Sequence, residues 1–294
     1  MRLDESKNDE FRMMNLQNRQ DAITSPIGVF DSGVGGLSVL RSIREQMPEE
    51  SVLYFGDQGH VPYGPRSMGQ IQSFSAGITR FLLDHGSKLI VVACNTASAA
   101  ALTYLRESFP GVSFVGMEPA VKPAAETTKT GRVGVLATPA TFQGALYASV
   151  VERFGTGVEL FQHTCPGLVS QIEKGELDSA ATRAILEDAL HPMLEKNIDT
   201  VVLGCTHYPF VIPLIQEVVG GAERVRVIDP APSVAKQAKR LLETAGMKNP
   251  SGRRASIRFF TSGDVESMKS MLPVLLGEVG DVELAVWQND EEVK

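Results

Sequence analysis

The segment VVACNT at residues 91–96 has a close counterpart later in the chain, VLGCTH at residues 202–207. In each segment a short apolar run ends in a cysteine, Cys94 in the first and Cys205 in the second. Continuous apolar runs of this length are typical of strands that are buried on both faces of a parallel sheet. Ligands of open α/β sheets bind at the carboxyl ends of such strands. We therefore expect both cysteines at ligand-binding edges.

A second pair of similar segments indicates an internal repeat. Residues 27–32 (IGVFDS) resemble residues 133–138 (VGVLAT), and each segment ends in a hydroxyl residue. Alternating βα sequences produce such matches by chance, and two copies are fewer than a solenoid needs. Here, however, both pairs occur in the same order and end in reactive or hydrogen-bonding residues. The repeat predicts two related α/β domains with a quasi-twofold relation.

Apolar, β-branched runs alternate with longer amphipathic runs along the chain, which is typical of βα units around a parallel sheet. Strands are expected at residues 27–30, 51–55, 89–93, 133–137, 158–161, 200–203, 225–228 and 257–260. Helices are expected at residues 71–82 before Gly86, at 99–105, at 139–154 before Gly155, at 180–194, and on both sides of the last strand.

These elements predict the fold class α/β, with two pseudo-symmetric domains, mainly parallel central sheets and an active site in the cleft between them. Residues 25–118 and 230–294 are expected to form the first domain, and residues 119–229 the second. Residues 1–24 mix charged residues with scattered apolar ones. This stretch is expected to be a solvated tail without a signal peptide.

Composition excludes several classes of protein. The chain has 294 residues, 43% hydrophobic, and a formal net charge of -7 without a basic run, so nucleic acid is not expected as a primary partner. Apolar runs are far shorter than the roughly 20 residues that a membrane helix needs. Three cysteines are an odd number for a disulfide framework. Free thiols indicate a reducing compartment, and we expect a cytoplasmic protein.

The two cysteines suit the inversion of a stereocentre, because that reaction needs a base on one face of a carbon and an acid on the other. Residues 95–98 after Cys94 are a polar turn that opens a helix, whose N–H groups are expected to lower the thiol pKa toward neutrality. Cys205 has an imidazole two residues later, at His207. Asp31 and His207 are the groups expected to tune the two thiols.

Two glycine-containing segments are candidate walls of the site. The loop DSGVGG at residues 31–36 allows backbone N–H groups to approach an anion. Because Ser38 stands where a dinucleotide fingerprint needs glycine, and no phosphate-binding lysine motif or nucleophile elbow is present, the loop favours a carboxylate over a nucleotide. The segment GDQGHVPYG at residues 56–64 follows the second strand and is expected at the same sheet edge.

A zinc site is an alternative interpretation of the sulfur and imidazole groups. Cys94, Cys165, Cys205 and His207 could in principle provide four ligands, but the chain lacks C-x₂-C and H-x₃₋₅-H spacing. The thiol interpretation is therefore favoured, no metal is expected, and Cys165 is interpreted as a packing residue.

Four motifs in order resemble the glutamate racemases of the cofactor-independent aspartate/glutamate racemase family. They are residues 28–37, 61–64, 91–98 and 203–209, and the resemblance extends over about residues 26–275. It implies an isomerase that needs no cofactor and works with two bases. Cys94 resembles the base for D-glutamate and Cys205 the base for L-glutamate.

The resemblance also implies roles for further residues. Asp31 and His207 resemble the side chains that assist the thiols, and Glu173 resembles a third assisting carboxylate. Related aspartate racemases carry glutamate at the position of His207, so this histidine favours glutamate as the substrate. The remaining positions resemble the substrate contacts, namely Ser32, Pro62, Tyr63, Gly64, Asn95, Thr96, Thr138, Thr141 and Thr206.

Free glutamate is the partner that the resemblance implies, with D-glutamate supplied for peptidoglycan synthesis in a bacterial cytoplasm. Homodimers are common in the family. The N-terminal extension is similar to that of members regulated by a cell-wall precursor, although none of its residues indicates a regulator site. Three alternatives stay open from sequence: a racemase for aspartate or another acidic amino acid, a non-catalytic dicarboxylate-binding protein, and a zinc hydrolase.

Overall fold

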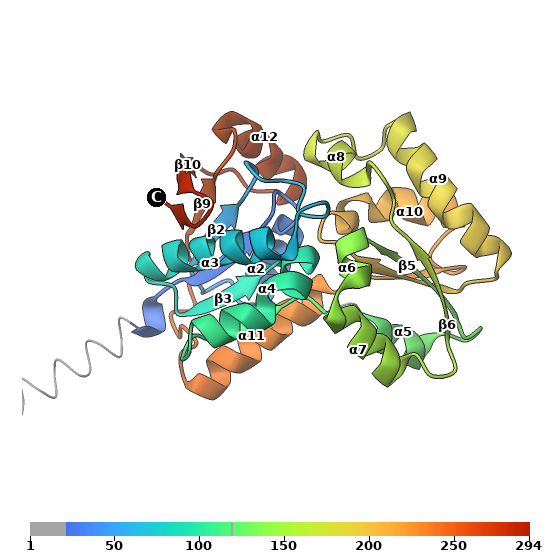
Figure 1. Ribbon diagram of the computed structural model, residues 1–294, viewed down its shortest axis with the longest axis horizontal. Helices are drawn as coiled ribbons and strands as arrows, with labels where there is room; N and C mark the ends of the chain where they lie inside the picture. The colour runs from blue at the N-terminus through green and yellow to red at the C-terminus, as the bar shows by residue number, and fades with distance from the viewer. Residues whose placement is uncertain (1–21, 119) are drawn as a thin grey trace, which may run out of the picture.

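The computed structural model describes residues 22–118 and 120–294, and it has two α/β halves, each with its own parallel sheet (Figure 1). Residues 1–21 of the expected tail lie outside the described part. Residues 22–24 form a helical turn, and the carbonyl oxygen of Ile23 accepts a hydrogen bond of 2.6 Å from Nζ of Lys88. Ile23, near the end of the expected tail, is therefore hydrogen-bonded to the first half.

The first sheet has six parallel strands in the order β10-β9-β2-β1-β3-β4. Its strands are β1 (Ile27–Asp31), β2 (Val52–Gly56), β3 (Leu89–Val92), β4 (Phe114–Gly116), β9 (Ile257–Thr261) and β10 (Val282–Leu284). Every residue of β1, β2 and β3 is buried. This burial explains why their sequences are apolar almost throughout, because helices cover both faces of the sheet.

The second sheet has the order β6-β5-β7-β8 and is also parallel throughout. Its strands are β5 (Arg132–Ala137), β6 (Glu159–His163), β7 (Thr200–Gly204) and β8 (Arg226–Ile228). In both sheets the first four strands of the half lie in the order second, first, third, fourth, so β6-β5-β7-β8 corresponds to β2-β1-β3-β4 of the first sheet. The topology confirms the predicted repeat and the α/β fold class, and it makes β3 and β7 equivalent strands.

Helices surround the two sheets, and α2 packs on α11 while α3 packs on α4. The helices are α2 (Leu37–Gln46), α3 (Met68–Asp84), α4 (Asn95–Ser108), α5 (Val121–Thr127), α6 (Pro139–Gln143), α7 (Ala145–Phe154), α8 (Leu168–Glu173), α9 (Ala180–Glu195), η1 (Tyr208–Val211), α10 (Ile212–Val219), α11 (Ala231–Ala245) and α12 (Val265–Leu275). None of the helices in the described part of the chain is both long and apolar enough to span a bilayer.

Two sequence predictions need correction. The single helix expected at 139–154 is two helices, because Gly144 between α6 and α7 has an extended backbone, with φ -71° and ψ 139°. A Cβ at Gly144 would lie 2.8 Å from the Cβ of Ala99, so glycine allows this turn to lie close against α4. Helix α4 itself begins at Asn95, not at residue 99.

Four short strands were not predicted. β4 and β10 have three residues each, and β11 (Trp287–Asn289) pairs with β12 (Glu292–Val293) in a small antiparallel hairpin near the end of the chain. Segments of two or three residues are too short to show a hydrophobic period.

Candidate active site

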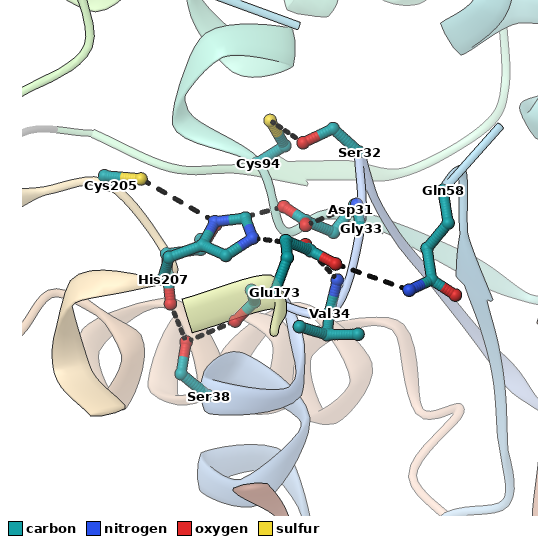
Figure 2. Close-up of polar contacts among 12 residues, drawn as sticks. Asp31, Ser32, Gly33, Val34, Ser38, Gln58, Cys94, Glu173, Cys205 and His207 are labelled. Atoms are coloured by element: carbon teal, nitrogen blue, oxygen red, sulfur yellow. Dashed lines mark hydrogen bonds and ion pairs between the residues drawn. The ribbon is translucent and has the colours of Figure 1, made fainter. Parts of the chain in front are cut away.

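The two cysteines lie just after the carboxyl ends of the equivalent strands β3 and β7, and they line the same narrow cavity. Cys94 caps α4, where its sulfur accepts a hydrogen bond of 3.4 Å from the backbone N–H of Ala97 and lies 3.7 Å from the Ser32 hydroxyl. Cys205 Sγ lies 3.8 Å from Nδ1 of His207. Figure 2 shows the Cys94 sulfur beside Ser32 and the Cys205 sulfur facing the His207 ring. The repeated strand topology therefore brings one thiol from each half to a shared cavity.

The walls of this cavity come from both halves of the protein. They contain Ser32, Pro62, Tyr63, Gly64, Asn95, Thr96, Thr138, Val169, Thr206 and His207 in addition to the two cysteines. All residues that resemble substrate contacts are in this set except Thr141. Thr141 lies behind Thr138, with the two hydroxyl oxygens 2.9 Å apart, and Thr138 is in turn 3.0 Å from the hydroxyl of Thr96.

Asp31 lies at the end of β1 and is fully buried. Its carboxylate accepts hydrogen bonds from the N–H of Gly33 at 2.9 Å and from the hydroxyl of Thr206 at 3.0 Å. Burial raises the pKa of Asp31, although the nearby imidazole of His207 and the hydrogen bonds oppose that change. The aspartate is thus tied to the residue that follows Cys205.

The buried imidazole of His207 pairs with the partly buried carboxylate of Glu173 (Figure 2). Nε2 of His207 is 2.6 Å from Oε1 of Glu173, and its other ring nitrogen faces Cys205. Burial lowers the pKa of His207, but the contact with Cys205 and the hydrogen bond to Glu173 raise it more. The pKa of His207 is therefore well above its ordinary value. Burial raises the pKa of Glu173, but the imidazole outweighs this and lowers it. The pair therefore favours imidazolium beside carboxylate.

The expected lowering of the Cys94 pKa is wrong for this structure. The sulfur does cap the helix as predicted, and the Ala97 N–H favours the thiolate. Burial has the larger effect, however, and together with the negative charge of Asp31 it raises the pKa of Cys94. The sequence indicated the helix terminus but not the complete burial of the sulfur beside a carboxylate.

Glycines in the loop at residues 33–36 permit close contact between the two halves. A Cβ at Gly35 would lie 2.4 Å from Nδ1 of His207, and a Cβ at Gly33 would lie 2.1 Å from Oε1 of Glu173. The N–H of Val34 donates a hydrogen bond of 2.9 Å to that same carboxylate oxygen. The loop thus binds a carboxylate of the protein itself, from the other half.

Sequence reasoning missed Val169 and Gln58 at the site. Val169 lies on α8 and lines the cavity, and Nε2 of Gln58 donates a hydrogen bond of 3.3 Å to Glu173. The segment containing Gln58 was a candidate wall, but nothing in its sequence distinguishes this side chain. Val169 is one apolar helix residue among many.

Cys165 is buried within a hydrophobic cluster, and burial raises the pKa of its thiol to about 12. It does not line the cavity. Across residues 22–118 and 120–294, no group of three or more His, Cys, Asp or Glu side chains is arranged to hold a metal ion.

Comparisons with known proteins agree with the motifs. Residues 27–238 match the Asp/Glu/Hydantoin racemase family. The glutamate racemase of Pseudomonas paraeruginosa is 52% identical over 256 residues, which cover 87% of this chain and 96% of that protein.

Two solved structures share the fold. The glutamate racemase isoform RacE1 of Bacillus anthracis superposes with a TM-score of 0.78 at 35% identity, covering 90% of this chain and 98% of that one. The Escherichia coli glutamate racemase, in complex with L-glutamate and the activator UDP-MurNAc-Ala, has a TM-score of 0.74 at 31% identity, with 89% and 98% covered. The resemblance drawn from the motifs is thereby confirmed, and the chain belongs to the Asp/Glu/Hydantoin racemase family of isomerases.

Proposed function

We propose that the protein is a glutamate racemase, which interconverts L-glutamate and D-glutamate by moving one proton at Cα between Cys94 and Cys205. The observation that carries this proposal is that the two thiols, from equivalent strands of the two sheets, line one cavity. Two bases on opposite faces of a carbon are what an inversion by proton transfer requires. The names of the relatives support glutamate as the substrate.

In the proposed reaction a thiolate removes the Cα proton, and the thiol on the opposite face donates its proton to the resulting carbanion. The enzyme is left with the reverse protonation of its two sulfurs, and no oxidant or reductant is consumed. Cys94 acts as the base on D-glutamate and Cys205 as the base on L-glutamate. His207, 3.8 Å from Cys205, is placed to stabilise that thiolate, and Glu173 keeps the imidazole in position.

Asn95 supports the binding of an amino acid in the cavity. Its side chain is 3% exposed and lines the cavity, and within the described structure neither its Nδ2 nor its Oδ1 has a hydrogen-bond partner. Buried amides without partners are costly, so such groups commonly await a ligand. We infer that the donor faces a substrate carboxylate and the acceptor an ammonium group. Thr96 and Thr138 add hydroxyls on the same wall.

The biological setting belongs to the same proposal. D-glutamate would supply peptidoglycan synthesis in the cytoplasm, the enzyme would work as a homodimer, and a cell-wall precursor could regulate it, as the activator bound to the Escherichia coli relative suggests. We also propose that residues 25–118 with 230–294, and residues 119–229, are the two domains. The strands of the two sheets divide along these limits.

The test is to incubate the purified protein with each enantiomer of glutamate in buffered D₂O. Circular dichroism follows racemisation, and proton NMR follows the loss of the Cα–H signal. We expect both enantiomers to racemise and to gain deuterium, with aspartate turned over far more slowly. Saturable binding of glutamate without deuterium exchange would indicate a binding protein. Faster turnover of aspartate than of glutamate would identify aspartate as the substrate. Loss of activity in the presence of a chelator would favour the zinc alternative.

A further inference from the structure

The chain has a single tryptophan, Trp287, and it lies in the hairpin formed by β11 and β12. This hairpin is docked on α3. Ser73 Oγ and Arg80 Nη1 of that helix donate hydrogen bonds to the backbone carbonyls of Asp290 and Glu291, at 2.8 Å and 2.7 Å. A Cβ at Gly77 would lie 2.8 Å from the indole ring, so glycine at this helix position allows the ring to approach.

The indole N–H points to a buried carboxylate. Nε1 of Trp287 donates a hydrogen bond of 2.9 Å to Oδ1 of Asp57, which is fully buried. The same oxygen accepts a hydrogen bond of 2.6 Å from the hydroxyl of Ser262. Nδ1 of His60 lies 3.0 Å from Oδ2, and its ring stacks on Phe74 at 3.9 Å between centroids. Among the described residues no lysine or arginine forms an ion pair with Asp57, so its buried carboxylate depends on these polar contacts.

The other carboxylate oxygen connects this network to the cavity between the cysteines. The Tyr63 hydroxyl donates a hydrogen bond of 2.6 Å to Oδ2 of Asp57, while the Tyr63 side chain lines the cavity and is 1% exposed. Pro62 and Gly64, its neighbours, line the cavity too. A rotation of the Asp57 carboxylate would therefore move the phenol and the wall segment around it. Trp287 reaches the cavity wall through one intervening side chain.

We propose that Trp287 is a positioning residue for the substrate cavity, and that the hairpin formed by β11 and β12 fixes Tyr63 through Asp57. This inference rests on the proposed function, because its readout is the binding of glutamate. Trp287 is not among the residues that line the cavity with the two thiols. Its loss is expected to affect substrate binding more than the proton transfer itself.

The central variant is Trp287→Phe, which keeps an aromatic ring against α3 and removes the N–H donor. Its matched control is Tyr147→Phe, which removes a hydroxyl that accepts a 2.9 Å hydrogen bond from Gln162 and does not line the cavity. We expect Trp287→Phe to raise KM for both enantiomers about threefold or more with kcat within about twofold, and Tyr147→Phe to change neither. An unchanged KM in a folded Trp287→Phe protein overturns the proposal.

A double variant separates the positioning role from a general loss of packing. If Trp287 acts through Asp57 on Tyr63, the KM of Trp287→Phe combined with Tyr63→Phe should be no higher than that of the worse single variant, because both changes break one chain of contacts. If the double variant raises KM by the product of the two single-variant factors, the two residues act independently and the inference is contradicted.

Fluorescence provides a measurement that needs no variant, should Trp287→Phe fail to fold. Because Trp287 is the only tryptophan, its emission in the wild-type protein should change saturably as D-glutamate is added, with half-saturation near the kinetic KM. An unchanged emission at saturating glutamate counts against the coupling. A wild-type protein that fails to racemise glutamate overturns the proposed function, whereas an active enzyme with these negative results overturns only the role of Trp287.

Discussion

The hydroxyl of Thr206 donates a 3.0 Å hydrogen bond to Oδ1 of Asp31, which joins the residue after Cys205 to the carboxyl end of β1 in the other half. Ser38 strengthens this connection, because its hydroxyl donates a hydrogen bond of 2.9 Å to the carbonyl oxygen of Thr206. The two sheet edges are thus bonded to each other beside the cavity. This junction explains how thiols that belong to separate sheets come to share one site.

Replacement of either cavity cysteine should abolish racemisation. We expect Cys94→Ala and Cys205→Ala each to reduce racemisation by about 10³-fold or more, because each removes one of the two proton-transfer groups. Cys165→Ala is the control, since this buried thiol lies outside the cavity. It should keep activity within about threefold while it costs about 1 kcal/mol of stability. Circular dichroism measures the rates, and a wild-type rate in either cavity variant would rule out the assignment.

The pair of His207 and Glu173 should make stability depend on pH. The pKa of His207 is raised above its ordinary 6.5, so its contribution to stability is complete below pH 6.5 and is lost as pH rises through the raised value. The pKa of Glu173 is lowered below its ordinary 4.5, so its contribution is present above pH 4.5 and is lost as pH falls through the lowered value. The pair therefore contributes most between about pH 4.5 and 6.5.

Glu173→Gln tests this dependence. The variant should lose about 1.5–3 kcal/mol of unfolding free energy within that window, and the deficit should shrink at higher pH. Urea unfolding from pH 5 to 9.5 measures it, with the exposed Glu195→Gln at the end of α9 as control. A deficit that grows with rising pH would show that the imidazolium is not the partner of Glu173.

Asp31→Asn should make Cys94 more acidic. The negative charge of Asp31 is second only to burial among the factors that raise the pKa of Cys94, and a neutral amide removes it. The pH at which iodoacetamide labels Cys94 should therefore move down, as followed by mass spectrometry of the peptide. Labelling of Cys165 in the same sample is the internal control, because Asp31 is not among the causes of its pKa shift. A shift to higher pH for Cys94 contradicts the electrostatic assignment.

Gly35→Ala should impair catalysis through a steric effect. The added Cβ would lie 2.4 Å from Nδ1 of His207 and 2.7 Å from the Thr206 hydroxyl, so the loop or the imidazole beside Cys205 must shift. Displacements of this kind cost on the order of 10²-fold in kcat/KM. Gly69→Ala in α3 is the matched control, since nothing lies within 4 Å of its added Cβ. That control should keep full activity and gain about 0.5–1 kcal/mol of stability.

Much of the fold was predictable because the two sheets have strong local signals. The buried strands β1, β3 and β7 are continuous apolar runs, and the repeat around Cys94 and Cys205 predicted equivalent strand positions. Short or interrupted elements had no such signal. Gly144, which breaks the expected helix at 139–154, lies so close to Ala99 on another helix that an added Cβ would be 2.8 Å from it, and sequence periodicity does not contain that proximity.

The candidate site was predictable where residues lie next to a strand end, and less so where side chains arrive from distant segments. Asp31, Cys94 and Cys205 lie at or just after the ends of strands, while Glu173 was assigned only through the family resemblance. The partners Gln58 and Val169 come from a loop and a short helix whose positions depend on tertiary packing. Burial also reversed the expected pKa shift of Cys94, because a sequence does not give the solvation of a sulfur.

The most direct test of the two-thiol account is the position of deuterium at early conversion in D₂O. Starting from D-glutamate, we expect the L-glutamate formed in the first few per cent of reaction to carry deuterium at Cα, while the remaining D-glutamate keeps its original hydrogen. This follows because one sulfur removes the proton and the other delivers a solvent-derived one. L-glutamate that retains the substrate's own hydrogen would mean that a single group moves the proton between faces, and would contradict the account.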